Sequence, residues 1–307
     1  MKRRVKQHIM QAKTLLKLLF HLPLQKSFME KILFVTDGIN LNMTALDFAA
    51  YLGRLTHSKL TGIFLENLVD EQRLVLKETH NYSYLNYEVD EGSAAYVEKM
   101  NLIQQNVVKF EEACLKRDVR CNVHYNRSVP AEEIIKESRY ADLIVADAAA
   151  SFNKKYEGAP TDFIKDTLAN AECPVIIAPE NFEEINEIVF AYDDSASSVF
   201  AIKQFTYLFP ELNDKKLTVL QVNDKDFTAT AGKYNFKEWL KNHYGAIGFE
   251  VIIGNPDYEI FSCLLKKKNT IIVMGAYGRS AVSRYFKHSQ ADLLIKTLTQ
   301  PIFIAHH

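Results

Sequence analysis

The sequence from Met29 onward consists of two similar halves, and this repetition limits the possible folds more than any other feature. The apolar run 31–37 opens the first half, and the run 187–193 opens the second; both end at an aspartate. Each run is followed by a helical pattern and then by further apolar strands that alternate with helices. Such strands are typical of a parallel sheet covered by helices on both faces. The sequence therefore predicts two tandem, doubly wound α/β domains, each with a mostly parallel five-stranded sheet.

The predicted elements divide the chain after Met29 into a domain over 29–182 and a second domain over 186–307. The strands predicted for the first domain are 31–37, 60–66, 119–126, 142–147 and 174–179, and those for the second are 187–193, 217–222, 249–254, 270–275 and 301–306. Between strands two and three, the first domain carries an additional segment, 67–92, which contains several tyrosines. We expect this segment to be a loop and helix packed on its own domain, with a lid or a partner surface as the alternative. The amphipathic pattern at 93–116 predicts a long helix.

Residues 1–28 differ from the rest because they carry seven lysines and arginines and no acidic residue. Charge interrupts the apolar run, so neither a transmembrane helix nor a signal peptide is expected. One interpretation is a disordered tail or an extension upstream of the true start at Met29. A basic amphipathic helix on a membrane surface or a partner is the alternative.

The composition excludes several classes of partner. The 307 residues are 48% hydrophobic and 24% charged, with a formal net charge of −1. Such a balance gives no general attraction to nucleic acid or to an anionic membrane, and we expect neither nucleic-acid binding nor integral membrane association. Four cysteines form no C-x-x-C pair, which favours a cytoplasmic protein with cysteines as core residues.

The fourth strand of the second half runs into a motif suited to an anion. Gly275 and Gly278 follow the strand, a basic loop that begins at Arg279 comes next, and His288-Ser289 stands where a helix is predicted to begin. Glycines let backbone N–H groups approach a ligand closely, and a hydroxyl at a helix start lies beside an electropositive terminus. The alternatives are a tight turn for the glycines and a helix cap for the serine.

The spacing Gly275-x2-Gly278-x9-His288-Ser289 resembles the G-x2-G-x9-G-S/T motif of the universal stress protein family. The resemblance covers both halves and implies the tandem form, with two Rossmann-like domains of the adenine nucleotide alpha hydrolase type. It implies that Asp193 faces adenine or ribose, that Val222 reads adenine through its backbone, and that Gly275, Gly278 and Ser289 hold ribose and phosphates of ATP. Arg279 adds positive charge. His288 departs from the motif, because it replaces a glycine and can obstruct the approach to a phosphate.

The first domain has Asp147 and Ala150 in place of the two glycines, so we expect it not to bind ATP in the family's manner. Thr161, in register with Ser289, keeps a capping role. Asp193 has a second interpretation as a cap of the helix that follows it.

No catalytic motif is recognisable, and we predict that the chain is not an enzyme and binds no metal. The resemblance implies a regulator that acts through protein contacts in the stress response, with the two domains forming an internal pseudo-dimer through their last strands, 175–178 and 302–305, and with a homodimer as a further option. The alternative is a switch that binds ATP in the second domain only.

Overall fold

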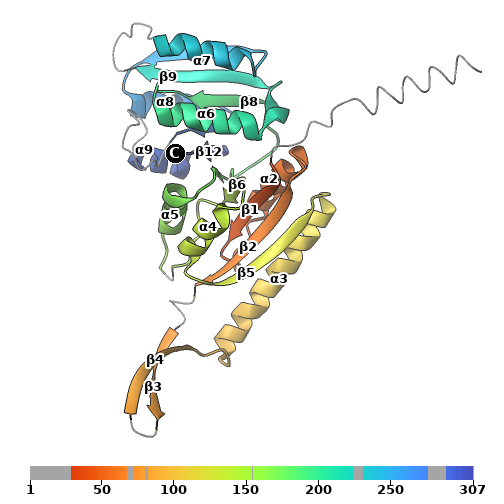
Figure 1. Ribbon diagram of the computed structural model, residues 1–307, viewed down its shortest axis with the longest axis vertical. Helices are drawn as coiled ribbons and strands as arrows, with labels where there is room; N and C mark the ends of the chain where they lie inside the picture. The colour runs from red at the N-terminus through yellow and green to blue at the C-terminus, as the bar shows by residue number, and fades with distance from the viewer. Residues whose placement is uncertain are drawn as a thin grey trace, which may run out of the picture.

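The computed structural model describes residues 29–67, 72–79, 82–153, 155–223, 231–275 and 288–306, and the basic segment 1–28 lies outside them. One ten-stranded sheet has the order β10-β9-β8-β11-β12-β7-β6-β1-β2-β5 (Figure 1). The first half supplies β1 (Lys31–Thr36), β2 (Lys59–Asn67), β5 (Cys121–Ser128), β6 (Leu143–Ala146) and β7 (Val175–Ile177). The second half supplies β8 (Glu187–Ala191), β9 (Lys216–Asn223), β10 (Ile247–Ile253), β11 (Thr270–Met274) and β12 (Ile302–Ile304). Neighbouring strands within each half are parallel, which confirms the predicted fold class.

Helices cover both faces of this sheet and bury a hydrophobic cluster on each. One cluster takes residues from α2 (Met43–Leu55), α3 (Ala94–Lys116), α6 (Ala196–Leu208) and α7 (Ala231–Lys241). The other takes residues from α4 (Pro130–Ser138), α5 (Asp162–Asn170), α8 (Pro256–Leu264) and α9 (His288–Thr297). A 3-10 turn, η2 (Pro210–Leu212), follows α6. Both clusters contain residues of both halves, so each cluster is a core that the two halves share.

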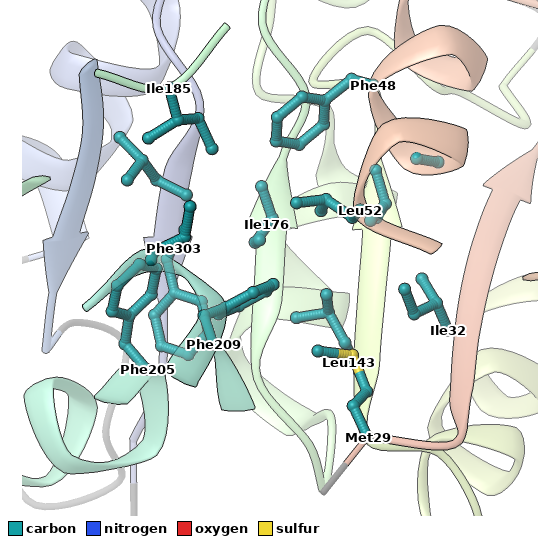
Figure 2. Packing of buried hydrophobic residues seen from close by; sticks show 14 of the residues in the cluster. Met29, Ile32, Phe48, Leu52, Leu143, Ile176, Ile185, Phe205, Phe209 and Phe303 are labelled. Carbon is teal, nitrogen blue, oxygen red and sulfur yellow. The ribbon is translucent and has the colours of Figure 1, made fainter. Parts of the chain in front are cut away.

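The halves are joined by their last strands, which are the only antiparallel neighbours described in the ten-stranded sheet. β12 pairs with β7, with Phe303 opposite Ile176. Phe205 and Phe209 of the second half lie beside Phe303, whose side chain is fully buried (Figure 2). The ring centroids of Phe205 and Phe303 are 5.3 Å apart in an edge-to-face arrangement. The predicted internal pseudo-dimer through the last strands is confirmed.

The additional segment of the first domain was predicted wrongly. It forms β3 (Gln72–Thr79) and β4 (Tyr82–Val89), an antiparallel hairpin that is a sheet of its own. Figure 1 shows this hairpin extending away from the ten-stranded sheet. The sequence QRLVLKET has a short apolar run, 74–76, between polar residues, and the high β-propensity of the valines and tyrosines in the two strands favours the hairpin.

Polar side chains start four of the helices. Asn42, Ser93, Thr161 and Ser195 each accept a hydrogen bond from a backbone N–H in the first turn of α2, α3, α5 and α6 respectively. The predicted helix at 93–116 is thereby confirmed, with Ser93 as its N-cap. Within the described ranges, no helix combines the length and hydropathy that crossing a bilayer requires.

A partly buried ion cluster lies at the amino-terminal ends of the strands of the second half. Glu187, the first residue of β8, accepts hydrogen bonds from Thr218 Oγ1 at 2.7 Å and from Lys267 Nζ at 3.1 Å. Lys216 Nζ lies 3.1 Å from the same carboxylate oxygen. Burial raises the pKa of the Glu187 carboxyl, but these three donors outweigh burial and hold the pKa below its ordinary value.

The lowered pKa of Glu187 predicts a pH-dependent contribution to stability. The contribution is present above the unfolded-state pKa of about 4.3 and is lost as the pH falls through the lower folded-state pKa. Glu187→Gln should therefore lower the free energy of unfolding by about 1–3 kcal/mol near pH 7, with a difference that shrinks below about pH 4. Urea unfolding of the unmodified protein and of the variant, near pH 7 and below about pH 4, measures this difference. An equal difference in the free energy of unfolding at both pH values would contradict a lowered pKa of Glu187.

Candidate functional site

Three of the residues predicted to bind nucleotide lie at one edge of the sheet. Asp193 follows the end of β8, Val222 lies near the end of β9, and Gly275 follows β11 directly. β8 pairs with β9 on one side and with β11 on the other. The carboxyl ends of these strands meet at the edge where doubly wound sheets bind ligands, so the structure brings the three positions together.

Asp193 organises the start of α6. Its side chain is buried, and its Oδ1 accepts hydrogen bonds from the backbone N–H and the hydroxyl of Ser195, at 3.0 and 2.5 Å. Ser195 Oγ in turn accepts a hydrogen bond from the N–H of Ser198 at 3.1 Å. The interpretation of Asp193 as the helix cap is therefore wrong in detail, because Ser195 is the N-cap and Asp193 holds it in place. Whether Asp193 also faces a nucleotide stays a prediction.

Gly275 packs directly against the first turn of α6. A Cβ atom added at this position would lie 2.3 Å from the backbone oxygen of Ser197 and 2.6 Å from the backbone nitrogen of Ser198. The φ angle at Gly275 lies outside the range that favours glycine, which among the described glycines is found at Gly38 and Gly254. A left-handed backbone conformation is thus not the reason for glycine here. The absence of a side chain lets the helix N-terminus reach the end of the strand.

The remaining predicted site residues are only partly described. Gly278 and Arg279 lie outside the described residues, as does the rest of the basic loop. α9 begins at His288, so Ser289 is the second residue of the helix and not the residue before it. Its side chain is not described, and a role for His288 or Ser289 with a phosphate stays a prediction.

The first domain has a different arrangement at the equivalent place. Asp147, which stands where the second domain has Gly275, accepts a hydrogen bond from Asn42 Nδ2 at 2.6 Å and one from the Ala149 N–H at 2.9 Å. Asn42 is also the N-cap of α2. In the first domain, the side chains of Asp147 and Asn42 therefore connect the end of β6 to the start of α2. In the second domain, the backbone of Gly275 packs directly against the backbone of α6. Thr161 caps α5 as predicted.

Comparison with known proteins identifies the fold. A universal stress protein from Archaeoglobus fulgidus matches 92% of this chain and 99% of its own length, with a TM-score of 0.63 at 17% identity. The chain has the tandem universal stress protein fold. A protein of unknown function from Pseudomonas aeruginosa PAO1 covers 91% of the chain with a TM-score of 0.52 at 15% identity. A proposed universal stress protein from Pseudomonas aeruginosa UCBPP-PA14 also covers 91%, with a TM-score of 0.51 at 13% identity. No family model and no curated protein matches the sequence.

A cavity of about 230 Å³ lies at the strand ends of the first universal stress protein unit. Its lining residues are Phe34, Val35, Thr36, Asp37, Asn40, Asn42, Asp147, Ala149 and Ala150. The two carboxylates, Asp37 and Asp147, make this lining unsuited to a phosphate, because like charges repel. Asn42 is a site residue that the sequence did not single out, although an asparagine directly before an apolar helix is a recognisable N-cap signal.

The described residues include no group of three or more metal-ligating side chains of the kind that holds a metal ion. Burial raises the pKa of three cysteine thiols, and for Cys173 it does so to about 12. Thiols with raised pKa values are weak nucleophiles, and Cys114 is a buried core residue. These observations favour a packing role for the cysteines.

Proposed function

We propose that the chain is a tandem member of the universal stress protein family and a non-catalytic regulator that acts through protein contacts in the stress response. The pairing of β12 with β7 carries this proposal. In the family this final strand commonly forms the contact between two subunits. Here one chain supplies both partners, so its two units are held together without a ligand and present a preformed surface. We expect this surface to meet its partners in the cytoplasm.

The structure also supports a second candidate, a switch that binds ATP in the second unit only. Asp193, Val222 and Gly275 lie at the ends of three adjacent strands, where the fold binds ligands. The intervening loop carries Arg279, Arg284 and Lys287, whose charge suits a triphosphate. ATP binding there would change the surface available to a partner.

Thermal unfolding with and without magnesium and ATP separates the two candidates. A ligand present at about 100 times its dissociation constant stabilises the folded state by roughly 2.7 kcal/mol. Under the regulator proposal we expect no change in Tm and no release of phosphate from ATP. A rise in Tm without phosphate release would favour the switch. Turnover of ATP would contradict both candidates.

Charge-reversal variants locate any binding that is found. Arg279→Glu should abolish the rise in Tm if the second unit holds ATP, because it places a carboxylate in the basic loop. Lys155→Glu is the matched control, since Lys155 is an exposed residue in the equivalent loop of the first unit. Gly275 is unsuitable for this purpose, because any side chain there collides with α6. A rise in Tm that survives Arg279→Glu but not Lys155→Glu would place the nucleotide in the first unit.

A further inference from the structure

The outer strand of the second half, β10, carries exposed apolar side chains at an open edge of the sheet. In the part of the chain that the structure describes, β10 pairs with β9 alone. Phe249, Val251 and Ile253 are 40%, 48% and 61% exposed and, as alternate residues, share one face of the strand. Soluble proteins usually protect an edge strand with charge, proline or a covering element, because its free backbone groups recruit other strands.

The backbone N–H and C=O groups of these three residues point away from β9. Leu217 N–H of β9 donates to Ala246 C=O, and the register pairs Leu217 with Ile247. In a parallel sheet, each residue directs both its N–H and its C=O toward the same adjacent strand, and successive residues alternate between the two sides. The even-numbered residues of β10 therefore face β9, and Phe249, Val251 and Ile253 direct their hydrogen-bonding groups away from the sheet.

The opposite outer strand, β5, has a longer helix beside it than β10 has. α3, with 23 residues, lies along β5 (Figure 1), and Cys121 and Val123 of β5 are partly buried against the core. The Tyr125 hydroxyl contacts Met100 of α3 and donates a hydrogen bond to Glu66. The corresponding helix beside β10, α7, has 11 residues. Its Lys237 Nζ lies 4.5 Å from the centre of the Phe249 ring, and Val251 and Ile253 stay 48% and 61% exposed.

We propose that β10 is a docking surface for β10 of a second copy of this chain, paired antiparallel about a two-fold axis through Val251. In that register Val251 pairs with Val251 of the other copy, and Phe249 pairs with Ile253 in both directions. All three exposed apolar side chains then meet an apolar partner, and the outward backbone groups pair with one another. Such a self-complementary contact is what a two-fold dimer requires.

Repulsion between carboxylates favours this register over the one with the two-fold axis at Glu250. An axis through Glu250 would place the two Glu250 carboxylates directly opposite each other, which is destabilising. The axis through Val251 places Glu250 opposite Ile252 of the other copy and moves the carboxylates to diagonal positions. Lys267 Nζ lies 4.0 Å from the Glu250 carboxylate on the same face and offsets its charge.

The proposed dimer goes beyond the function proposed above, since it uses a strand other than the internally paired β7 and β12. One pair of short strands buries little area, so the dimer should be weak, and the fraction of chains in dimers should rise with protein concentration. Dimerisation would extend the ten-stranded sheet across two chains.

Reciprocal charge variants at the two-fold axis test the proposal. Val251→Lys and Val251→Glu each place like charges opposite each other, and each should weaken dimerisation about tenfold or more in sedimentation velocity measurements. An equimolar mixture should restore the dimer as a mixed species, because lysine then faces glutamate. Native mass spectrometry with one variant isotope-labelled identifies that species. Tyr140→Lys, at a residue 78% exposed and remote from β10, is the matched control and should dimerise like the unmodified protein.

Unfolding curves of the variants establish that they fold, since Val251 is half exposed and its backbone does not bond to β9. A protein that stays monomeric at every concentration would overturn the proposal. So would a dimer that both single variants leave unchanged, or one that the mixture fails to restore. In the last case residue 251 does not face its counterpart, and the interface lies elsewhere.

Discussion

Replacing Phe303 with alanine is expected to lower the free energy of unfolding by about 3–5 kcal/mol. Phe303 is fully buried at the joint between the halves, opposite Ile176 of β7. Its ring centroid lies 5.3 Å from that of Phe205 and 6.3 Å from that of Phe209. Alanine would leave a cavity where both halves meet, and the surrounding strands cannot collapse into it fully. Urea unfolding followed by circular dichroism measures the loss.

The exposed aromatic residue Tyr156 provides the control for this variant. Its side chain is 97% exposed, so Tyr156→Ala should change the free energy of unfolding by no more than about 0.5 kcal/mol. A Phe303→Ala variant as stable as the Tyr156→Ala variant would mean that the β7–β12 joint contributes little to the fold. The proposal that one rigid unit presents the contact surface would then lose its main support.

Gly275→Ala should destabilise the protein by about 3 kcal/mol, at the upper end of what overpacking usually costs. The new Cβ would lie 2.3 Å from the Ser197 oxygen, and the atoms it meets belong to the backbone of a helix and not to a flexible side chain. Relief therefore requires α6 to move away from β11. Thermal unfolding of the variant measures the cost.

Gly245→Ala is the matched control, because a Cβ at Gly245 meets no atom within 4 Å. It should leave Tm unchanged or raise it slightly, since alanine reduces the entropy of the unfolded chain. If both glycine variants were equally stable, close packing would not explain Gly275, and a ligand role for that glycine would gain support.

The sequence predicted the class of fold correctly because that information is local. Apolar runs such as Ile32–Val35 and Ile188–Ala191 are buried on both faces of the sheet, and the helices between them have ordinary starting signals. The same local patterns located Asp193 and Gly275 at strand ends. The hairpin β3–β4 was missed because the apolar run in QRLVLKET is only three residues long and shows neither the period of a strand nor that of a helix.

The candidate site was harder to predict because its contacts join residues distant in sequence. Asn42 and Asp147 are 105 positions apart, and nothing in either local sequence indicates that they bond. Gly275 and Ser197 are likewise separated by most of a domain, so a glycine with a packing role had the same local pattern as one with a ligand role. The sequence indicated the correct positions, and the structure supplied the packing reason.

The sequence alone determined the duplication, the parallel α/β class and the chemical difference between Gly275 and Asp147, because each depends on the order of residues along the chain. Only the tertiary structure decided that the halves share one sheet, that α6 requires glycine at the end of β11, and that β10 is left with an exposed apolar edge. These features depend on how strands and helices from distant parts of the chain pack, and burial of apolar area fixes that arrangement without leaving a pattern in any one segment.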